Sequence, residues 1–124
     1  MEPFALSQKL EDLNVVLHEA VQKYPKSERF GIAKETTMCG VRAAAMVARG
    51  NQIKAPQEKA RCMYQADAEI AQLKVLVRLA LRLKVRDAPF LSSKKYGQIA
   101  VLIDEVGRMI GGWIKSAANA GTRL

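Results

Sequence analysis

Apolar residues return at alternating intervals of three and four positions along several parts of the chain. Such spacing places them on one side of an α-helix, where they can pack against neighbouring helices. The first series consists of Leu6, Leu10, Leu13, Leu17, Ala20 and Tyr24. A helix is therefore predicted over residues 4–24, and it should end before Pro25 because a residue that precedes proline avoids helical geometry.

Turn residues divide the rest of the sequence into three more helical segments. Ser27 is a suitable N-cap for the second, which continues to the joint "RGNQIKAPQ". The third ends before Pro89, and Ser92 or Ser93 caps the fourth. The predicted helices span residues 4–24, 27–50, 57–85 and 93–117. The small residues of "GVRAAAMVARG" should let a neighbour approach the second helix closely.

Four helices with short joints predict an all-α fold, an antiparallel up-down-up-down four-helix bundle. With 124 residues, 49% of them hydrophobic, the chain can bury one core, so residues 1–124 are expected to form a single domain. Residues 118–124 are expected to be a frayed tail. The third and fourth helices are apolar over more of their circumference than one bundle interior needs, which predicts an oligomer.

The fourth helix carries an apolar stripe and two glycines four residues apart. The stripe consists of Ile99, Leu102, Val106, Met109 and Trp113, widened by Ile103, Ile110 and Ile114. Gly107 and Gly111 predict a flat ridge for close helix packing, so Gly111→Leu is expected to overpack a contact.

The stretch Lys74–Arg86, "KVLVRLALRLKVR", combines two periodicities. Alternation of apolar and basic residues, typical of a strand, holds only over Leu81–Arg86. Cations at every fourth position span the whole stretch, and the apolar run before them is too long for one strand. A helix is therefore predicted. This basic series consists of Lys74, Arg78, Arg82 and Arg86.

The chain is strongly basic, with 20 Lys and Arg against 12 Asp and Glu, a formal charge of +8 and a pI near 9.8. This excess favours an anionic partner: nucleic acid, an acidic membrane surface or an acidic protein. No acidic residue occurs from Gln72 to Arg86, so no neighbour on the helix neutralises the basic series. Arginine also suits phosphate and carboxylate geometry. A second group of cations surrounds the second joint: Arg49, Lys54, Lys59 and Arg61.

Residue patterns for catalysis, cofactors and metals are missing from the sequence. His18 is the only histidine and is expected to be partly buried and structural. Asp104 and Glu105 are adjacent, so a helix would point them about 100° apart. Neither a phosphate-binding glycine loop nor a dinucleotide fingerprint occurs. We therefore expect that the protein is not an enzyme and that it binds neither a cofactor nor a metal ion.

Cysteine usage and the N-terminus indicate where the protein resides. Cys39 and Cys62 are too few and too far apart for a disulfide framework, which favours a reduced cytoplasm. The segment "MEPFALSQKLEDL" has early acidic residues and no long apolar region, so it is not expected to be a signal peptide. No window approaches the ~20 apolar residues of a membrane-spanning helix.

Three stretches resemble known families. "YPKSERFGI" resembles the entry to the second helix in bacterial four-helix-bundle proteins encoded in intervening sequences of ribosomal RNA genes. "YQADAEIAQLKVLVRLALRL" and "IAVLIDEVGRMIGGWIKS" are similar to one branch of that group, the accessory variability determinant proteins of diversity-generating retroelements. The likeness covers nearly the whole chain and is strongest over Glu105–Ile114. Where the larger group often has Ser-Ile-Pro-x-Asn, this chain has "AAAMVARGN", which favours the retroelement branch.

The resemblance implies a basic pentameric barrel of four-helix bundles without catalytic activity. Such a barrel binds the retroelement's reverse transcriptase and nucleic acid, RNA or DNA, during mutagenic copying of a template RNA. By position, Lys74 and Arg78 match a basic pair of the family's third helix. Arg108 and Trp113 match its helix-four motif, with an expected structural role.

Two other functions remain open from the sequence. One is that of a ribosomal intervening-sequence protein of unknown role, which neighbouring genes would distinguish. The other is a membrane-surface or protein-adaptor bundle, which liposome binding without nucleic-acid binding would favour.

Overall fold

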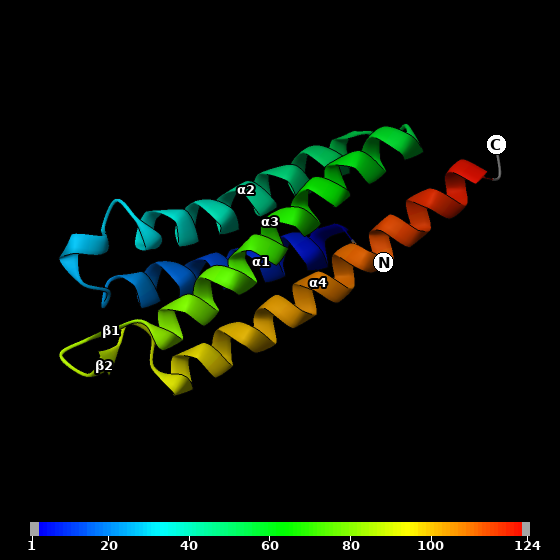
Figure 1. Cartoon of the computed structure of the whole chain (residues 1–124). Coiled ribbons are helices and arrows are strands. Elements are labelled where there is room, and N and C mark those ends of the chain that lie inside the picture. The colour runs from blue at the N-terminus through cyan, green and yellow to red at the C-terminus, as the bar shows by residue number, and fades with distance from the viewer. Residues whose placement is uncertain (1–2, 123–124) are drawn as a thin grey trace.

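The computed structural model describes residues 3–122 and is almost entirely helical in that range (Figure 1). The prediction of four α-helices is confirmed. They are α1 (Pro3–Val21), α2 (Ile32–Gln52), α3 (Pro56–Arg82) and α4 (Ser93–Thr122). A 3₁₀ helix, η1 (Lys26–Glu28), joins α1 to α2, and two short strands, β1 (Lys84–Val85) and β2 (Ala88–Pro89), lie between α3 and α4.

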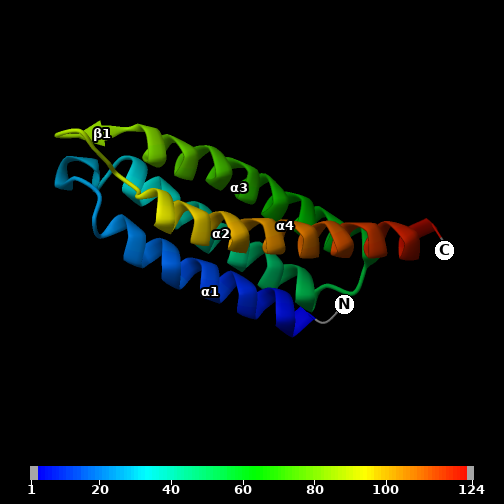
Figure 2. The ribbon, with the colours of Figure 1, turned by 90° about the horizontal axis from the view of Figure 1, so that it is seen from below.

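The four helices pack side by side around one core. α1 contacts α2 and α4, and α3 also contacts α2 and α4. Figure 2 shows α4 lying between α1 and α3, with α2 behind it. The α1–α2 connection and the β1–β2 hairpin lie at one end of the bundle, whereas the α2–α3 connection lies at the other (Figure 1). None of the helices described is long and apolar enough to cross a lipid bilayer.

The core follows the predicted spacing closely on α1 and less closely on α4. Leu6, Leu10, Leu13 and Leu17 are completely buried, and Ala20 and Tyr24 are nearly so. On α4 the buried side chains are Ile99, Ile103, Val106, Ile110 and Ala117. Leu102, Met109 and Trp113, predicted to be central, are only partly buried against this core. The buried stripe therefore keeps Ile99 and Val106 but is rotated by about 50° around the helix axis relative to the prediction, toward Ile103 and Ile110.

The small residues of α2 allow close approach, as predicted. A Cβ added at Gly40 would lie 2.5 Å from Asn14 Oδ1 and 2.9 Å from Leu17 Cδ1 on α1. Asn14 Nδ2 donates a hydrogen bond to the Gly40 carbonyl at 3.0 Å. At Gly50 an added Cβ would lie 2.8 Å from Met63 Cε on α3. Both glycines therefore remove side-chain bulk where two helices touch.

The prediction that Gly107 and Gly111 form a ridge for close helix packing is wrong for contacts within this chain. An added Cβ at Gly107 or Gly111 would meet nothing within 4 Å. Gly111→Leu is therefore not expected to overpack a helix contact inside the subunit.

The joint between the first two helices differs from the prediction. α1 ends at Val21, three residues early, and α2 begins at Ile32 rather than residue 27. Ser27 lies inside η1 and does not cap α2, whose N-cap residue is Gly31. Burial of the Tyr24 ring, whose centroid lies 5.8 Å from that of Phe90, turns the chain before α2 can start.

The end of the third helix also differs, because α3 stops at Arg82 and a two-stranded hairpin follows. The strand-like alternation of this stretch therefore does form β-structure at its end. Arg86 and Asp87 have φ of 53° and 66°, and two successive positive φ angles are typical of the type I′ turn that joins hairpin strands. Leu91 N donates to Ala80 O at 3.0 Å, and the Leu91 side chain is buried. Docking Leu91 on the core folds the chain back, so Arg86 is not on the helix.

The last helix begins as predicted and ends later. Ser92 Oγ accepts a hydrogen bond from Lys95 N at 3.2 Å, which confirms the cap at Ser92. α4 continues to Thr122, so the expected frayed tail is helical over residues 118–122. Residues 123–124 lie outside the described part of the chain.

Candidate nucleic-acid interface

Three of the four predicted cations form a row along α3. Lys74, Arg78 and Arg82 are exposed and recur every fourth residue, so they lie within about 80° of arc and over about 12 Å of helix length. The opposite face of α3 is anchored in the core by Leu73, Val77 and Ala80. This α3 basic row (Lys74, Arg78, Arg82) is therefore held on a rigid element, with its charges directed to solvent.

The surroundings leave these charges largely unneutralised. A shallow cleft of about 160 Å³ between α3 and α4 is lined by Lys74, Arg78 and Asp104, among others. The Asp104 carboxylate lies 2.8 Å from Arg108 Nη2 and is already paired. Within residues 3–122, no carboxylate lies within salt-bridge distance of Lys74, Arg78 or Arg82. The α3 basic row can therefore offer its donors to an external anion.

Cations of the hairpin and of the α4 start lie near the end of this row. Arg86 is exposed in the turn of the hairpin, and Lys84 is exposed on β1. Lys94, also exposed, is in the first turn of α4. Sequence reasoning missed Lys84 and Lys94, since only the fold brings the hairpin and the α4 start to one end of the bundle (Figure 1).

The second predicted group of cations is remote from the first. Arg49, Lys54 and Arg61 are exposed around the α2–α3 connection, at the opposite end of the bundle. Arg61 and Arg82 are 21 residues apart on one helix, which separates their Cα atoms by about 31 Å. Lys59 lies over the Trp113 ring, 4.8 Å from its centroid. The predicted site residues therefore form two surfaces.

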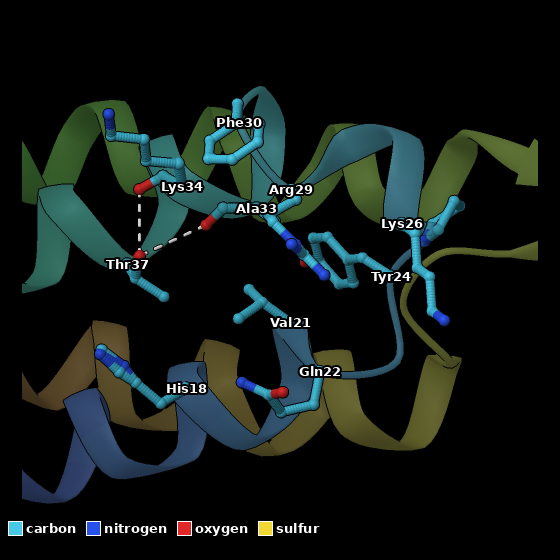
Figure 3. Close-up of a pocket in the computed structure, with 11 residues that line it drawn as sticks. His18, Val21, Gln22, Tyr24, Lys26, Arg29, Phe30, Ala33, Lys34 and Thr37 are labelled. Carbon is cyan, nitrogen blue, oxygen red and sulfur yellow. Dashed lines mark hydrogen bonds between the residues drawn. The ribbon is translucent and has the colours of Figure 1, made fainter.

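The groups considered for catalysis are dispersed. His18 is exposed rather than partly buried, and lines a pocket beside the α1–α2 connection (Figure 3). Asp104 and Glu105 diverge as predicted, since Glu105 Oε2 pairs with Lys9 Nζ on α1 at 2.9 Å. Burial raises the pKa of the Cys39 thiol to about 11, so it is protonated at neutral pH. The described residues include no group of three metal-ligating side chains.

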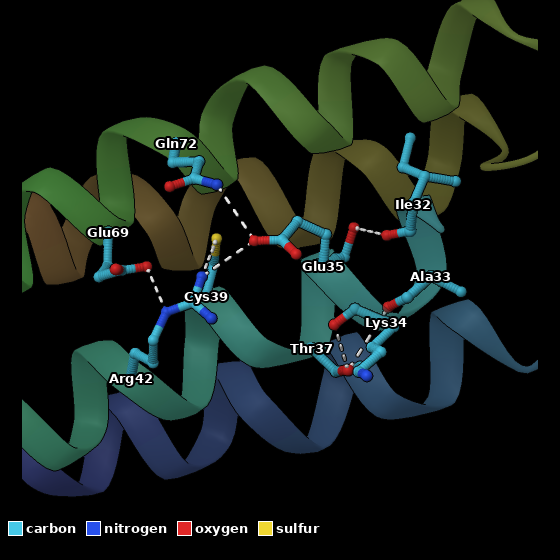
Figure 4. A network of polar contacts seen from close by, with 10 residues as sticks. Ile32, Ala33, Lys34, Glu35, Thr37, Cys39, Arg42, Glu69 and Gln72 are labelled. Carbon is cyan, nitrogen blue, oxygen red and sulfur yellow. Dashed lines mark hydrogen bonds and ion pairs between the residues drawn. The ribbon is translucent and has the colours of Figure 1, made fainter. Parts of the chain in front are cut away.

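A polar network joins α2 to α3 (Figure 4). Arg42 Nε donates to Glu69 Oε2 at 3.1 Å, and Arg42 Nη2 donates to Glu35 Oε1 at 3.0 Å. Gln72 Nε2 donates to the same Glu35 oxygen at 3.2 Å. Hydrogen bonds to Glu35 and then Glu69 raise the pKa of the Arg42 guanidinium. Arg42 is thus a structural cation held by two carboxylates, unlike the α3 basic row.

Replacing Arg42 with methionine is expected to lower the free energy of unfolding by about 1 kcal/mol, the upper end for partly exposed ion pairs. Methionine keeps most of the aliphatic stem but leaves Glu35 and Glu69 without their partner. Urea unfolding at 50 mM and 500 mM salt measures the effect, which should shrink at high salt. As the matched control, Arg108→Ala removes a more exposed pair and should change stability by less than about 0.5 kcal/mol. Equal losses of unfolding free energy in Arg42→Met and Arg108→Ala would contradict the assignment of Arg42 as a structural cation.

Comparison with known proteins identifies the family. A search of curated proteins finds no match. A family model described as bAvd-like, for bacterial accessory variability determinant, matches residues 4–117. The match begins in α1 and extends into α4, so it includes the hairpin and both basic surfaces. Because it covers nearly the whole chain, the protein belongs to the bAvd-like family of bacterial accessory variability determinants.

Proposed function

We propose that this protein is a non-catalytic accessory factor of a diversity-generating retroelement, which binds the reverse transcriptase and nucleic acid through its basic surface. The nucleic acid would be template RNA or its cDNA copy, and binding would support mutagenic reverse transcription. The observation that carries the proposal is the α3 basic row, three exposed cations without a carboxylate partner among residues 3–122, in a chain of this family.

The chemistry of the row suits a phosphate backbone. Two of its members are arginines, whose planar guanidinium can donate two parallel hydrogen bonds to one phosphate. Successive members are four residues apart, about 6 Å along the helix axis, close to the spacing of phosphates in an extended single strand. The formal charge of +8 adds long-range attraction for any polyanion.

The proposed assembly is a pentameric barrel of antiparallel bundles. Its support is exposed apolar surface on two neighbouring helices. On α3, Tyr64 and Val75 are 59% and 53% exposed; on α2, Val41 is 45% exposed. Exposed alanines continue both faces at helical spacing: Ala45 and Ala48 on α2, and Ala68 and Ala71 on α3. These α3 residues share a helix face with Arg78 and Arg82 but precede them, so the subunit contact would use the earlier turns of α3 and leave its last two turns uncovered. Burial between subunits would remove this apolar area from water. The sequence also predicted surplus apolar surface on α4. Among the described residues of α4, Val101 is the large hydrophobic side chain that is exposed.

Co-expression with the reverse transcriptase of the same retroelement tests the function. The wild-type chain should co-purify with the polymerase and support mutagenic copying, whereas the Arg78→Ala/Arg82→Ala double variant should lose the copying. Circular dichroism and light scattering should show unchanged helical content and assembly mass, because exposed charges add little to stability.

The matched control is Arg49→Ala/Arg61→Ala, which removes two exposed arginines from the other end of the bundle. Copying that is lost only in this control would place the functional surface at the α2–α3 connection. A stable particle of 13.7 kDa would rule out the ring.

A further inference from the structure

A pocket of about 560 Å³ opens beside the α1–α2 connection (Figure 3). Its walls come from the end of α1, from η1 and from the first turns of α2. The lining residues that matter for its chemistry are His18, Tyr24, Lys26, Arg29, Phe30 and Lys34. This volume lies within the range of small-molecule sites.

The charge that lines this pocket has one sign. Lys26, Arg29 and Lys34 are exposed, and no acidic residue lines the pocket. Glu28, the acidic residue of η1, lies against Gly31, where its carboxylate oxygens are 3.6 and 3.9 Å from the position of an added Cβ. None of the three cations pairs with a carboxylate in the part of the chain that the structure describes. The pocket therefore favours an anion.

Tyr24 supplies a hydrogen-bond donor that has no partner. Its side chain is 6% exposed, and its hydroxyl has no hydrogen bond within residues 3–122. Figure 3 shows the ring directed toward the middle of the pocket, where the Arg29 guanidinium is also drawn. Burial raises the pKa of Tyr24 to about 12, so the hydroxyl keeps its proton at neutral pH. Buried polar groups are rarely left unpaired, which points to an acceptor that binds beside this hydroxyl and Arg29.

Phe30 gives the same pocket a flat apolar surface. It is 82% exposed, the largest exposure among the large hydrophobic side chains described. An exposed aromatic ring can stack on a nucleobase.

We propose that this pocket binds a nucleotide with a terminal phosphate. Arg29 would hold the phosphate, the Tyr24 hydroxyl would donate a hydrogen bond to it, and the base would stack on Phe30. Lys26 and Lys34 lie at opposite sides of the pocket (Figure 3), so they would add positive potential around the phosphate without both contacting it. The ligand is either a free nucleoside monophosphate or the phosphorylated 5′ end of a single strand. This site is separate from the α3 basic row, which lies along the α3–α4 cleft.

Titration calorimetry on the full chain with adenosine monophosphate, adenosine and inorganic phosphate tests the proposal. The monophosphate should bind at least tenfold more tightly than adenosine. Tyr24→Phe should weaken its binding about fivefold without lowering the melting temperature, because the ring contact with Phe90 is kept. Phe30→Ala should weaken monophosphate binding while phosphate binding is unchanged.

Two further measurements separate the ligand source and the two sites. If a 5′-phosphorylated oligonucleotide binds more tightly than its 5′-hydroxyl form, the ligand is a strand end; if the two bind equally and the monophosphate binds, it is a free nucleotide. Arg78→Ala/Arg82→Ala should leave monophosphate binding intact. Loss of nucleic-acid binding at the α3 basic row can therefore be distinguished from loss of nucleotide binding in the pocket. Equal affinity for adenosine and its monophosphate, or wild-type monophosphate binding by Arg29→Gln and Tyr24→Phe, would overturn the proposal.

Discussion

The Arg78→Ala/Arg82→Ala variant is expected to flatten the salt dependence of nucleic-acid binding by about two units of log–log slope. Each phosphate of a DNA duplex that is neutralised by a cation contributes about −0.9 to that slope. If Lys74, Arg78, Arg82 and Arg86 contact four phosphates, the slope per subunit is about −3.6, which weakens binding ~150-fold between 50 and 200 mM salt. The double variant keeps a slope of about −1.8, which corresponds to a loss of affinity of only ~12-fold over the same salt range. Fluorescence anisotropy with a labelled duplex measures both slopes. On a labelled single strand, where each phosphate contributes about −0.7, the same contacts give slopes of about −2.8 and about −1.4.

Assembly and geometry affect how this result is interpreted. A ring would engage several subunits at once and steepen the slope in the wild type and the variant alike. Arg49→Ala/Arg61→Ala, the control at the other end of the bundle, should leave the slope nearly unchanged. If the Arg78→Ala/Arg82→Ala chain unfolds or dissociates while each folded particle retains wild-type affinity, the row is structural. The binding surface would then lie around Arg49, Lys54 and Arg61.

Alanine substitutions at Gly40 and Gly111 are expected to have opposite effects on stability. At Gly40 the new methyl group would overlap Asn14 Oδ1 and Leu17 Cδ1, and α1 and α2 must separate to admit it. Overpacking of this kind lowers the free energy of unfolding by about 1–3 kcal/mol. At Gly111 the methyl group meets nothing within 4 Å, and alanine stabilises an exposed helix over glycine by about 0.5–1 kcal/mol.

Urea unfolding of both variants, with light scattering in parallel, checks the pair. A Gly40→Ala chain of wild-type stability would mean that Asn14 swings aside at no cost. If Gly111→Ala instead reduces the assembly mass, the glycine ridge of α4 packs against another subunit, and the ridge predicted from sequence exists only between chains.

The helices and much of the core could be predicted from sequence because the underlying signal is local. An apolar residue every three or four positions puts Leu6, Leu10, Leu13 and Leu17 on one face, whatever the rest of the chain does. For the same reason Lys74, Arg78 and Arg82 were predicted to share a face, since their geometry depends on one helix alone. The chain's excess of positive charge is likewise a property of composition.

Helix ends and the surroundings of each site depended on tertiary contacts. α3 stops at Arg82 because Leu91 docks on the core and draws the following residues into a hairpin, which moves Arg86 off the helix. Arg42 meets Glu69, 27 residues away, only because α2 packs against α3. The cationic pocket exists because burial of Tyr24 turns the chain between α1 and α2. Such contacts join residues distant in sequence, and their free energy comes from packing against partners that no local pattern specifies.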